Sequence, residues 1–121
     1  MNMCLSGLPT TIIYHPDEHG VVGESFTLFC NNSANEFVSW WRRSNPDAEI
    51  DFISLRDGIL LNEFQERCRL EGDHLVFHKL ELNDTATYIC LEEAGQGVRH
   101  VTKLNVSGNQ RPVSQWQLIH C

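Results

Sequence analysis

Hydrophobic residues occur in short runs along the chain, and turn-forming residues separate these runs. The runs show little of the 3.6-residue period of an amphipathic helix. Residues 25–30 alternate most clearly, with Phe26, Leu28 and Cys30 on one face. A break is expected at residues 15–20, where Pro16 and Gly20 occur. The pattern therefore predicts an all-β protein, with strands at residues 10–14, 25–30, 37–43, 50–55, 67–70, 75–80, 85–92 and 98–106, to which residues 59–61 could add an edge strand.

Length and charge narrow the class of protein further. The chain has 121 residues, enough for one domain and one hydrophobic core. We expect the domain at residues 1–107 and a stalk or tail at residues 108–121, where the strand pattern fades. A formal net charge of −7 argues against nucleic acid and anionic lipid as partners. No apolar run reaches the about 18 residues that a membrane-spanning helix needs, so no membrane insertion is expected.

Five cysteines in a chain of this length indicate an oxidising compartment. None of them forms a C-x-x-C pair, which disfavours a zinc ribbon or a thioredoxin-type motif. Three glycosylation sequons begin at Asn31, Asn83 and Asn105. Together these features predict a glycoprotein that lies outside the cell, either as an ectodomain at the plasma membrane or as a secreted protein.

One set of residues is typical of a known fold. Cys30 and Cys90 flank Trp40, and the second cysteine ends the run from Asp84 through Tyr88 to Cys90. This pattern resembles the variable-type immunoglobulin domain. The resemblance implies a sandwich of two antiparallel sheets with an inter-sheet disulfide between the two cysteines and the tryptophan packed on it. It also implies a tyrosine that fixes a corner, an Arg67 or Arg69 partner for the aspartate, and a glycine bulge at residues 95–97.

Three segments extend the resemblance to inhibitory receptors of the programmed cell death type. These segments are residues 31–42, 65–70 and 83–90. The resemblance implies a ligand-binding ectodomain of an immune receptor, which binds a B7-type protein through the sheet that carries the tryptophan strand. The outward positions of that sheet are the expected partner-binding residues: Phe37, Ser39, Trp41, Leu91, Glu93, Arg99, Val101 and Lys103. The competing interpretation is that the chain's own loops or the hairpin at residues 50–55 cover Phe37 and Trp41.

Weaker resemblances leave other functions open. The chain is similar to the B- and T-lymphocyte attenuator and to the first domains of interleukin-1 family receptors. The latter resemblance implies a cytokine-binding domain or a secreted, for instance viral, decoy. Homophilic adhesion through the same face is a third alternative.

The remaining cysteines, Cys4, Cys68 and Cys121, leave three arrangements open. Cys4 could pair with Cys68, Cys121 could link two chains into a dimer, or some of the three could be free thiols.

No catalytic or metal centre is expected. His74 and His78 are four residues apart, which in a strand separates them by about 13 Å. They are therefore expected to be solvated rather than to share a zinc ion. The strained nucleophile turn or oriented base of a hydrolase is not recognisable in the sequence. We expect neither enzymatic activity nor a cofactor.

Overall fold

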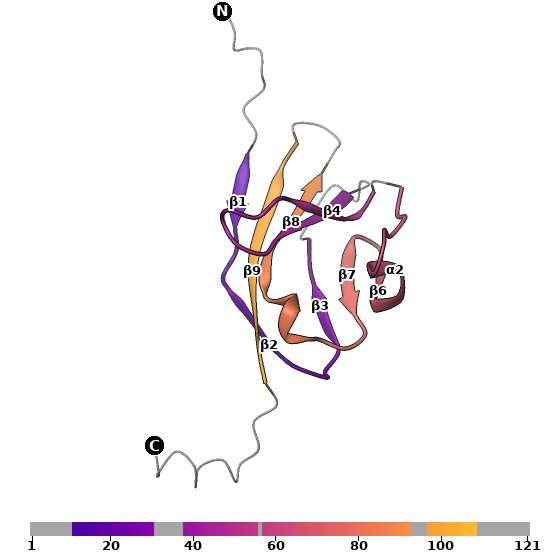
Figure 1. Cartoon of the computed structure of the whole chain (residues 1–121). Coiled ribbons are helices and arrows are strands. Elements are labelled where there is room, and N and C mark those ends of the chain that lie inside the picture. The colour runs from indigo at the N-terminus through magenta and orange to yellow at the C-terminus, as the bar shows by residue number, and fades with distance from the viewer. Residues whose placement is uncertain (1–10, 31–37, 56, 93–96, 109–121) are drawn as a thin grey trace, which may run out of the picture.

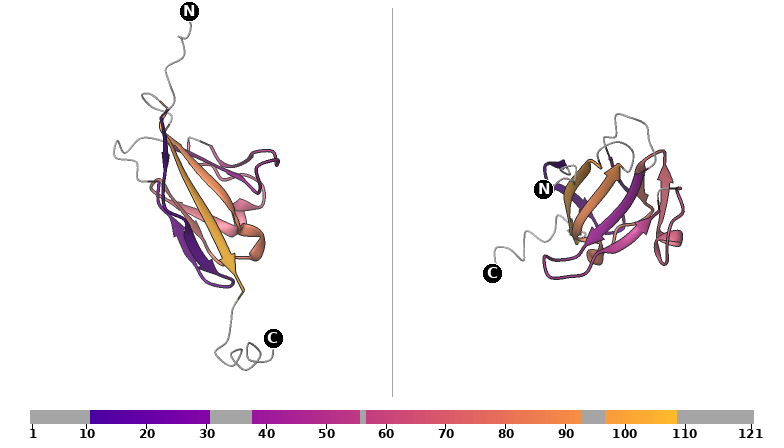
Figure 2. Two further views of the ribbon diagram at one scale, coloured as in Figure 1. Left: turned by 90° about the vertical axis from the view of Figure 1, so that its left-hand side faces the viewer. Right: turned by 90° about the horizontal axis from the view of Figure 1, so that it is seen from above.

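The structure is a computed structural model that describes residues 11–30, 38–55, 57–92 and 97–108. Within these ranges the chain forms nine strands, one short helix and one 3-10 turn. The strands lie in two layers that face one another (Figures 1 and 2). None of the helical segments in these ranges is long and apolar enough to cross a membrane.

The larger layer, the front sheet, has the strand order β1, β9, β8, β4 and β5, with β2 also paired to β9. Successive side chains of a strand point to opposite faces, so each strand gives one set to the core and one set to the outer surface. The bounds are β1 Ile12–Tyr14, β2 Glu18–Val21, β4 Val38–Arg43, β5 Asp51–Ser54, β8 Ala86–Glu92 and β9 Arg99–Ser107.

The smaller layer, the back sheet, contains three antiparallel strands in the order β3, β7 and β6. These are β3 Phe26–Leu28, β7 His74–Phe77 and β6 Cys68–Glu71. The helix α2, Phe64–Arg67, leads directly into β6, and the 3-10 turn η1, Leu82–Asp84, leads into β8. Both short helices therefore lie where the chain passes from one layer to the other.

A disulfide connects the two layers. Cys30 and Cys90 are bonded, with their Cα atoms 5.7 Å apart and a sequence separation of 60. Trp40 belongs to the same buried cluster and is 2% exposed. Its indole Nε1 donates to the carbonyl oxygen of Asp73 at 2.9 Å, so the buried polar end of the ring has a partner. The predicted fold is confirmed: the domain is an immunoglobulin-like β-sandwich.

The predicted corner and ion pair are also present. The Tyr88 hydroxyl donates to the Asp84 carbonyl oxygen at 2.5 Å. The Asp84 carboxylate, which is fully buried, accepts two hydrogen bonds of 2.7 Å from Arg67. Arg69 instead forms an exposed ion pair with Glu71. Of the two arginines considered, Arg67 is therefore the partner of Asp84. Hydrogen bonding to Asp84 raises the pKa of the Arg67 guanidinium above its ordinary value.

Most predicted strand ends differ by one or two residues from the observed ones, and the strand predicted at residues 75–80 corresponds to β7, which ends at Phe77. Two further predictions are wrong. The expected break at residues 15–20 contains β2, whose exposed Glu18 and His19 give no alternating pattern. β2 is attached to β9 through backbone hydrogen bonds, so its side-chain sequence does not reveal the strand. The strand expected from Arg67 begins instead at Cys68, because residues 64–67 form α2 and bury Phe64 beneath the sheet.

The edges of the front sheet also differ from the prediction of purely antiparallel sheets. β1 and β2 both pair with β9 in parallel. At the other edge, residues 59–61 contribute one isolated bridge, between Ser54 and Leu60, rather than a strand. The parallel pairing matters for the surface, because it adds β1 to the outer face of the front sheet.

Candidate protein-binding site

The predicted binding residues that the structure describes share the outer face of the front sheet. Ser39 is in register with Leu91, and Leu91 with Arg99, so these three side chains form a row across β4, β8 and β9. The alternation of each strand places the remaining described members on the same face: Trp41, Val101 and Lys103. Phe37 and Glu93 lie outside the described residues.

Ser39 supports the face rather than offering a contact of its own. Its side chain points outward, yet the residue is only 4% exposed. Its hydroxyl oxygen accepts a hydrogen bond of 3.1 Å from the indole Nε1 of Trp41. The serine therefore fixes the direction of the neighbouring tryptophan ring.

Trp41 is held from three sides. Besides the bond to Ser39, its ring lies 5.5 Å from the Phe52 ring, measured between centroids. The guanidinium carbon of Arg99 lies 5.1 Å from the Trp41 ring centroid, within the range of a cation–π contact. Phe52, in β5, covers part of Trp41, as the competing interpretation expected of this hairpin. Trp41 nevertheless remains half-buried and Phe52 is 51% exposed, so the aromatic pair reaches the surface.

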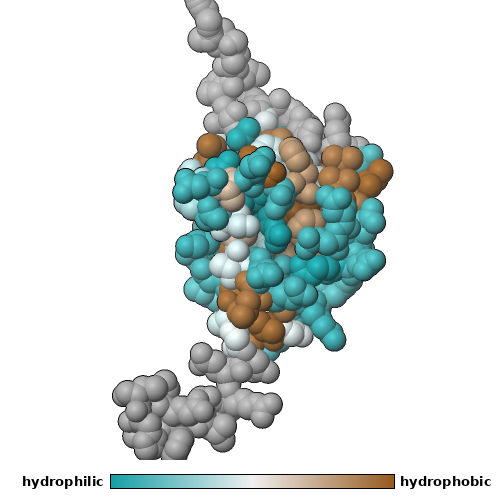
Figure 3. All heavy atoms as spheres, in the orientation of Figure 1, coloured by the Kyte–Doolittle hydropathy of each residue, from teal (hydrophilic) through white to brown (hydrophobic). Residues whose placement is uncertain are grey.

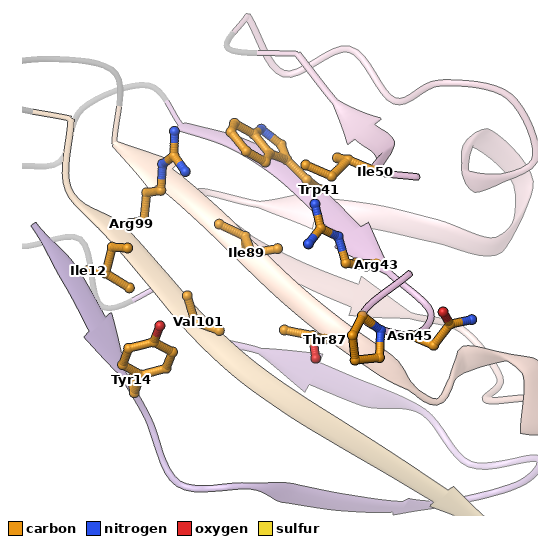
Figure 4. A pocket seen from close by; sticks show the side chains of 11 residues that line it. Ile12, Tyr14, Trp41, Arg43, Asn45, Ile50, Thr87, Ile89, Arg99 and Val101 are labelled. Carbon is orange, nitrogen blue, oxygen red and sulfur yellow. The ribbon is translucent and has the colours of Figure 1, made fainter. Parts of the chain in front are cut away.

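A groove of about 370 Å³ runs across this face (Figure 4). Three of the predicted residues line it: Trp41, Arg99 and Val101. Sequence reasoning missed the other lining residues, which are Ile12, Tyr14, Arg43, Asn45, Pro46, Ile50, Thr87 and Ile89. Parity with Trp41 and Leu91 could have found Arg43, Thr87 and Ile89, because each lies an even number of positions away on its strand. The residues of β1 could not have been found without its pairing to β9.

The groove is apolar along its floor and positively charged at its ends. Trp41 and Ile89 lie between the side chains of Arg99 and Arg43 (Figure 4). The residues that line the groove include two arginines and, among the described residues, neither aspartate nor glutamate. Lys103, exposed on β9, adds a third positive charge to the same face. This charge contrasts with the net charge of −7 of the whole chain.

Hydrophobic residues at the surface are not confined to the groove. Figure 3 shows them in separate patches among hydrophilic side chains on the face that it displays. Large exposed examples include Tyr14 at 75%, which lines the groove, and two residues outside its lining, Phe52 at 51% and Ile59 at 51%. Scattered apolar side chains of this kind are usual for soluble proteins. The combination of apolar floor, aromatic pair and arginines therefore distinguishes the groove better than hydrophobicity alone.

A hydrogen-bonded histidine pair lies on the inner side of the same sheet. His100 is 6% exposed, and its Nε2 atom lies 2.6 Å from a carboxylate oxygen of Glu92. Its Nδ1 lies 3.0 Å from Nε2 of His15, which follows β1. When Nε2 of His100 carries a proton, it donates to Glu92, and Nδ1 of the same ring can accept from Nε2 of His15. The cluster attaches the connection between β1 and β2 to β8 and β9, and so helps to position the β1 wall of the groove.

The residues described offer no sign of a reactive or metal-binding centre. Cys68 is buried and has no disulfide partner among them, while Cys4 and Cys121 lie outside the described ranges. Burial raises the pKa of the Cys68 thiol to about 12, which disfavours the reactive thiolate. No group of three or more histidine, cysteine, aspartate or glutamate residues in the described ranges could hold a metal ion.

Two of the three sequon asparagines can be placed. Asn83 is exposed in η1, and Asn105 is half-buried near the end of β9, in register with His19 of β2. Asn31 lies outside the described residues, as do residues 95–96 of the predicted glycine bulge. A glycan on Asn83 would leave the groove open, since η1 precedes β8 and contributes no residue to the groove lining.

Comparison with known proteins gives a limited but consistent result. No known family model matches the chain. The chain is 30% identical over 99 residues to Roundabout homolog 4 of Rattus norvegicus, covering 79% of this chain and 9% of that protein. It is 30% identical over 108 residues to myelin protein P0 of Bos taurus, covering 74% of this chain and 43% of that protein. Both are immunoglobulin-superfamily proteins.

The similarity is to an immunoglobulin-like domain. This agrees with the sandwich and the disulfide described above. The chain spans less than half of either relative, so the similarity concerns the domain and not the activity of a whole protein.

Proposed function

We propose that this immunoglobulin-like domain is the ligand-binding ectodomain of a cell-surface immune receptor of the inhibitory, programmed-death type. Its partner is a B7-type protein, which docks on the outer face of the front sheet around the groove. The observation that carries the proposal is Trp41, held on that face between Phe52 and Arg99. Tryptophan, tyrosine and arginine are the residues that most often dominate the binding energy of protein interfaces.

The rigidity of the face supports recognition without rearrangement. The groove residues of β4, β8 and β9 lie on hydrogen-bonded strands, and the disulfide ties β8 to the segment that follows β3 of the back sheet. A binding surface on rigid strands loses less conformational entropy on association than one on loops. The disulfide and the three sequons support an extracellular location.

A binding screen on the oxidised domain tests the proposal. Purified B7-type ectodomains and cytokines are passed over the immobilised domain, and the domain itself is included as a possible partner. We expect binding to a B7-type protein, and Trp41→Ala should weaken it by about tenfold or more, the usual effect of removing a central tryptophan. Binding of a cytokine alone would instead favour a cytokine receptor or decoy.

Phe29→Ala is the matched control. Phe29 follows β3, is 54% exposed and packs against the ring of His74, away from the front sheet. Its removal should change the affinity by less than about twofold. Equal effects of the two substitutions, or none of Trp41→Ala, would place the binding site elsewhere on the domain.

A further inference from the structure

The described arginines fall into two sets. Arg42, Arg67 and Arg69 each have a carboxylate oxygen close by, at 3.7, 2.7 and 2.7 Å respectively. Arg43 and Arg99, the two that line the groove, form no ion pair with any described residue. The chain has 16 acidic and 9 basic residues, so carboxylates are plentiful. Two arginines in one groove that pair with no described carboxylate therefore distinguish this face.

Each of these arginines also has an unused hydrogen-bond donor. The Nε atoms of Arg43 and Arg99 are shielded from solvent and have no hydrogen-bond partner among the described residues, a feature that Nε and Nη1 of Arg42 share. Neither guanidinium is therefore satisfied by a described residue, and its terminal N–H groups can pair with an incoming acceptor. A carboxylate fits best, because the guanidinium presents its N–H groups as a planar fork that matches the two oxygens.

The space between the two arginines suits an apolar side chain. Trp41 and Ile89 lie there, and both line the groove. Arg99 rests on the Trp41 ring, which leaves the edges of its guanidinium free for a carboxylate. The groove thus offers two positive ends and an apolar centre.

The strand register sets the separation of the two positive ends. Arg99 lies in the row of Ser39, and Arg43 lies four residues farther along β4. At about 3.3 Å per residue this is about 13 Å along the strands, and the two strand spacings from β9 across β8 to β4 add about 10 Å sideways. The backbone positions of the two arginines are therefore about 16 Å apart, which an extended segment of a partner covers in about five residues.

We propose that the groove binds an acidic, extended segment of a protein partner. One carboxylate of the segment binds Arg99, a second carboxylate about five residues away binds Arg43, and an apolar side chain between them packs on Trp41 and Ile89. Lys103 adds electrostatic attraction for the same segment. This inference rests on the proposed function, since it assigns a partner chemistry to the same face.

Selection from a displayed library of random short linear peptides tests the inference. The library is selected on the oxidised wild-type domain, and clones that also bind the Trp41→Ala variant are removed, so that the remaining clones are directed at the groove. We expect these clones to be enriched in pairs of aspartate or glutamate around an apolar residue. Each of Arg43→Gln and Arg99→Gln should weaken them by about tenfold or more. Their affinity should also fall as sodium chloride is raised from about 50 mM to about 500 mM.

Arg69→Gln is the matched control, because Arg69 is an exposed arginine of the back sheet with a carboxylate partner of its own. It should change peptide affinity by less than about twofold. Circular dichroism and thermal unfolding of every variant check that the fold is retained.

The outcomes separate this inference from the proposed function. Clones that require Trp41 but tolerate both arginine substitutions would overturn the acidic partner and leave the docking face intact. A library that yields no clone dependent on Trp41 would overturn the groove as a site for an extended segment, whereas the docking face itself is overturned only if Trp41→Ala leaves the binding of the protein ligand unchanged. A dimer in sedimentation velocity that Arg43→Gln and Arg99→Gln abolish would show that a second copy of the chain occupies the groove, and would overturn a foreign partner.

Discussion

The buried pair of Asp84 and Arg67 gives the sharpest prediction for stability. We expect Asp84→Asn to lower the free energy of unfolding by about 3 kcal/mol. The substitution keeps the size of the side chain and one acceptor oxygen, but it removes the negative charge. Arg67, whose side chain is 17% exposed, would then remain charged in a largely buried place without its main partner.

The contacts of Asp84 and Arg67 set the size of the expected loss in unfolding free energy. Asp84 accepts two bonds of 2.7 Å from Arg67 and one of 2.7 Å from the backbone N–H of Glu81. Breaking a buried ion pair costs about 3–5 kcal/mol. The lower end applies here, because Arg67 also lies 3.6 Å from the Glu81 carboxylate and 4.0 Å from that of Glu63. These partially exposed carboxylates can take over part of the interaction.

Urea unfolding followed by tryptophan fluorescence measures the effect, because Trp40 is buried in the core. The urea concentration at the midpoint of unfolding should fall, while the slope of the unfolding free energy against urea concentration stays constant. Glu71→Gln provides a matched control. Its pair with Arg69 has the same 2.7 Å contact, but the two side chains are 55% and 53% exposed. Its removal should cost less than about 1 kcal/mol.

The two variants together test whether burial sets the strength of an ion pair in this domain. A loss below about 1 kcal/mol for Asp84→Asn would show that the buried pair contributes no more than a surface pair. Equal losses in Asp84→Asn and Glu71→Gln would show that burial does not set the strength of these contacts. Either result would refute the expected loss of about 3 kcal/mol for Asp84→Asn.

Three further predictions concern the core. Tyr88→Phe removes the bond to the Asp84 carbonyl and should lower the free energy of unfolding by about 1–3 kcal/mol in urea titration; an unchanged midpoint would contradict this. Gly20→Ala should cost about 1–3 kcal/mol by the same assay, because the new Cβ would lie 2.3 Å from Cδ1 of buried Leu80, and a neutral result would mean that the core adapts freely. The pKa of Cys68 is raised from 9.0 to about 12, so between these values the unfolded chain loses a proton that the folded chain keeps. Stability from this thiol is therefore full below pH 9 and falls, by up to about 4 kcal/mol, as the pH rises toward 12. Cys68→Ala should flatten that decline, and equal slopes for the two proteins would disprove it.

The sequence predicted those parts of the fold that buried side chains define. The strands β8 and β9 alternate because one face of each packs in the core, and the Cys30–Cys90 disulfide follows from the resemblance. β2 left no such pattern, because its first two side chains are exposed and backbone bonds attach it to β9. The helix α2 is a single turn with only Phe64 buried, too short for a helical period to be visible.

The candidate site was predicted in part for the same reason. Parity within one strand placed Trp41, Arg99 and Val101 on the face that holds the groove. Tyr14 joins them only because β1 pairs with β9, a contact between residues far apart in sequence. The burial of Ser39 depends on its contact with the Trp41 ring, which no spacing reveals.

The parallel pairing of β2 with β9 also determines how the domain responds to tension. The two strands run in the same direction. A force that pulls on the chain before β2 and after β9 therefore slides one strand along the other. Several rungs of backbone hydrogen bonds, from the pair Glu18 and Leu104 to the pair Val21 and Ser107, then share the load instead of opening one after another. If the strands do slip apart, the Cys30–Cys90 bond keeps the intervening loop from extending, so the domain lengthens only by the segments outside that loop.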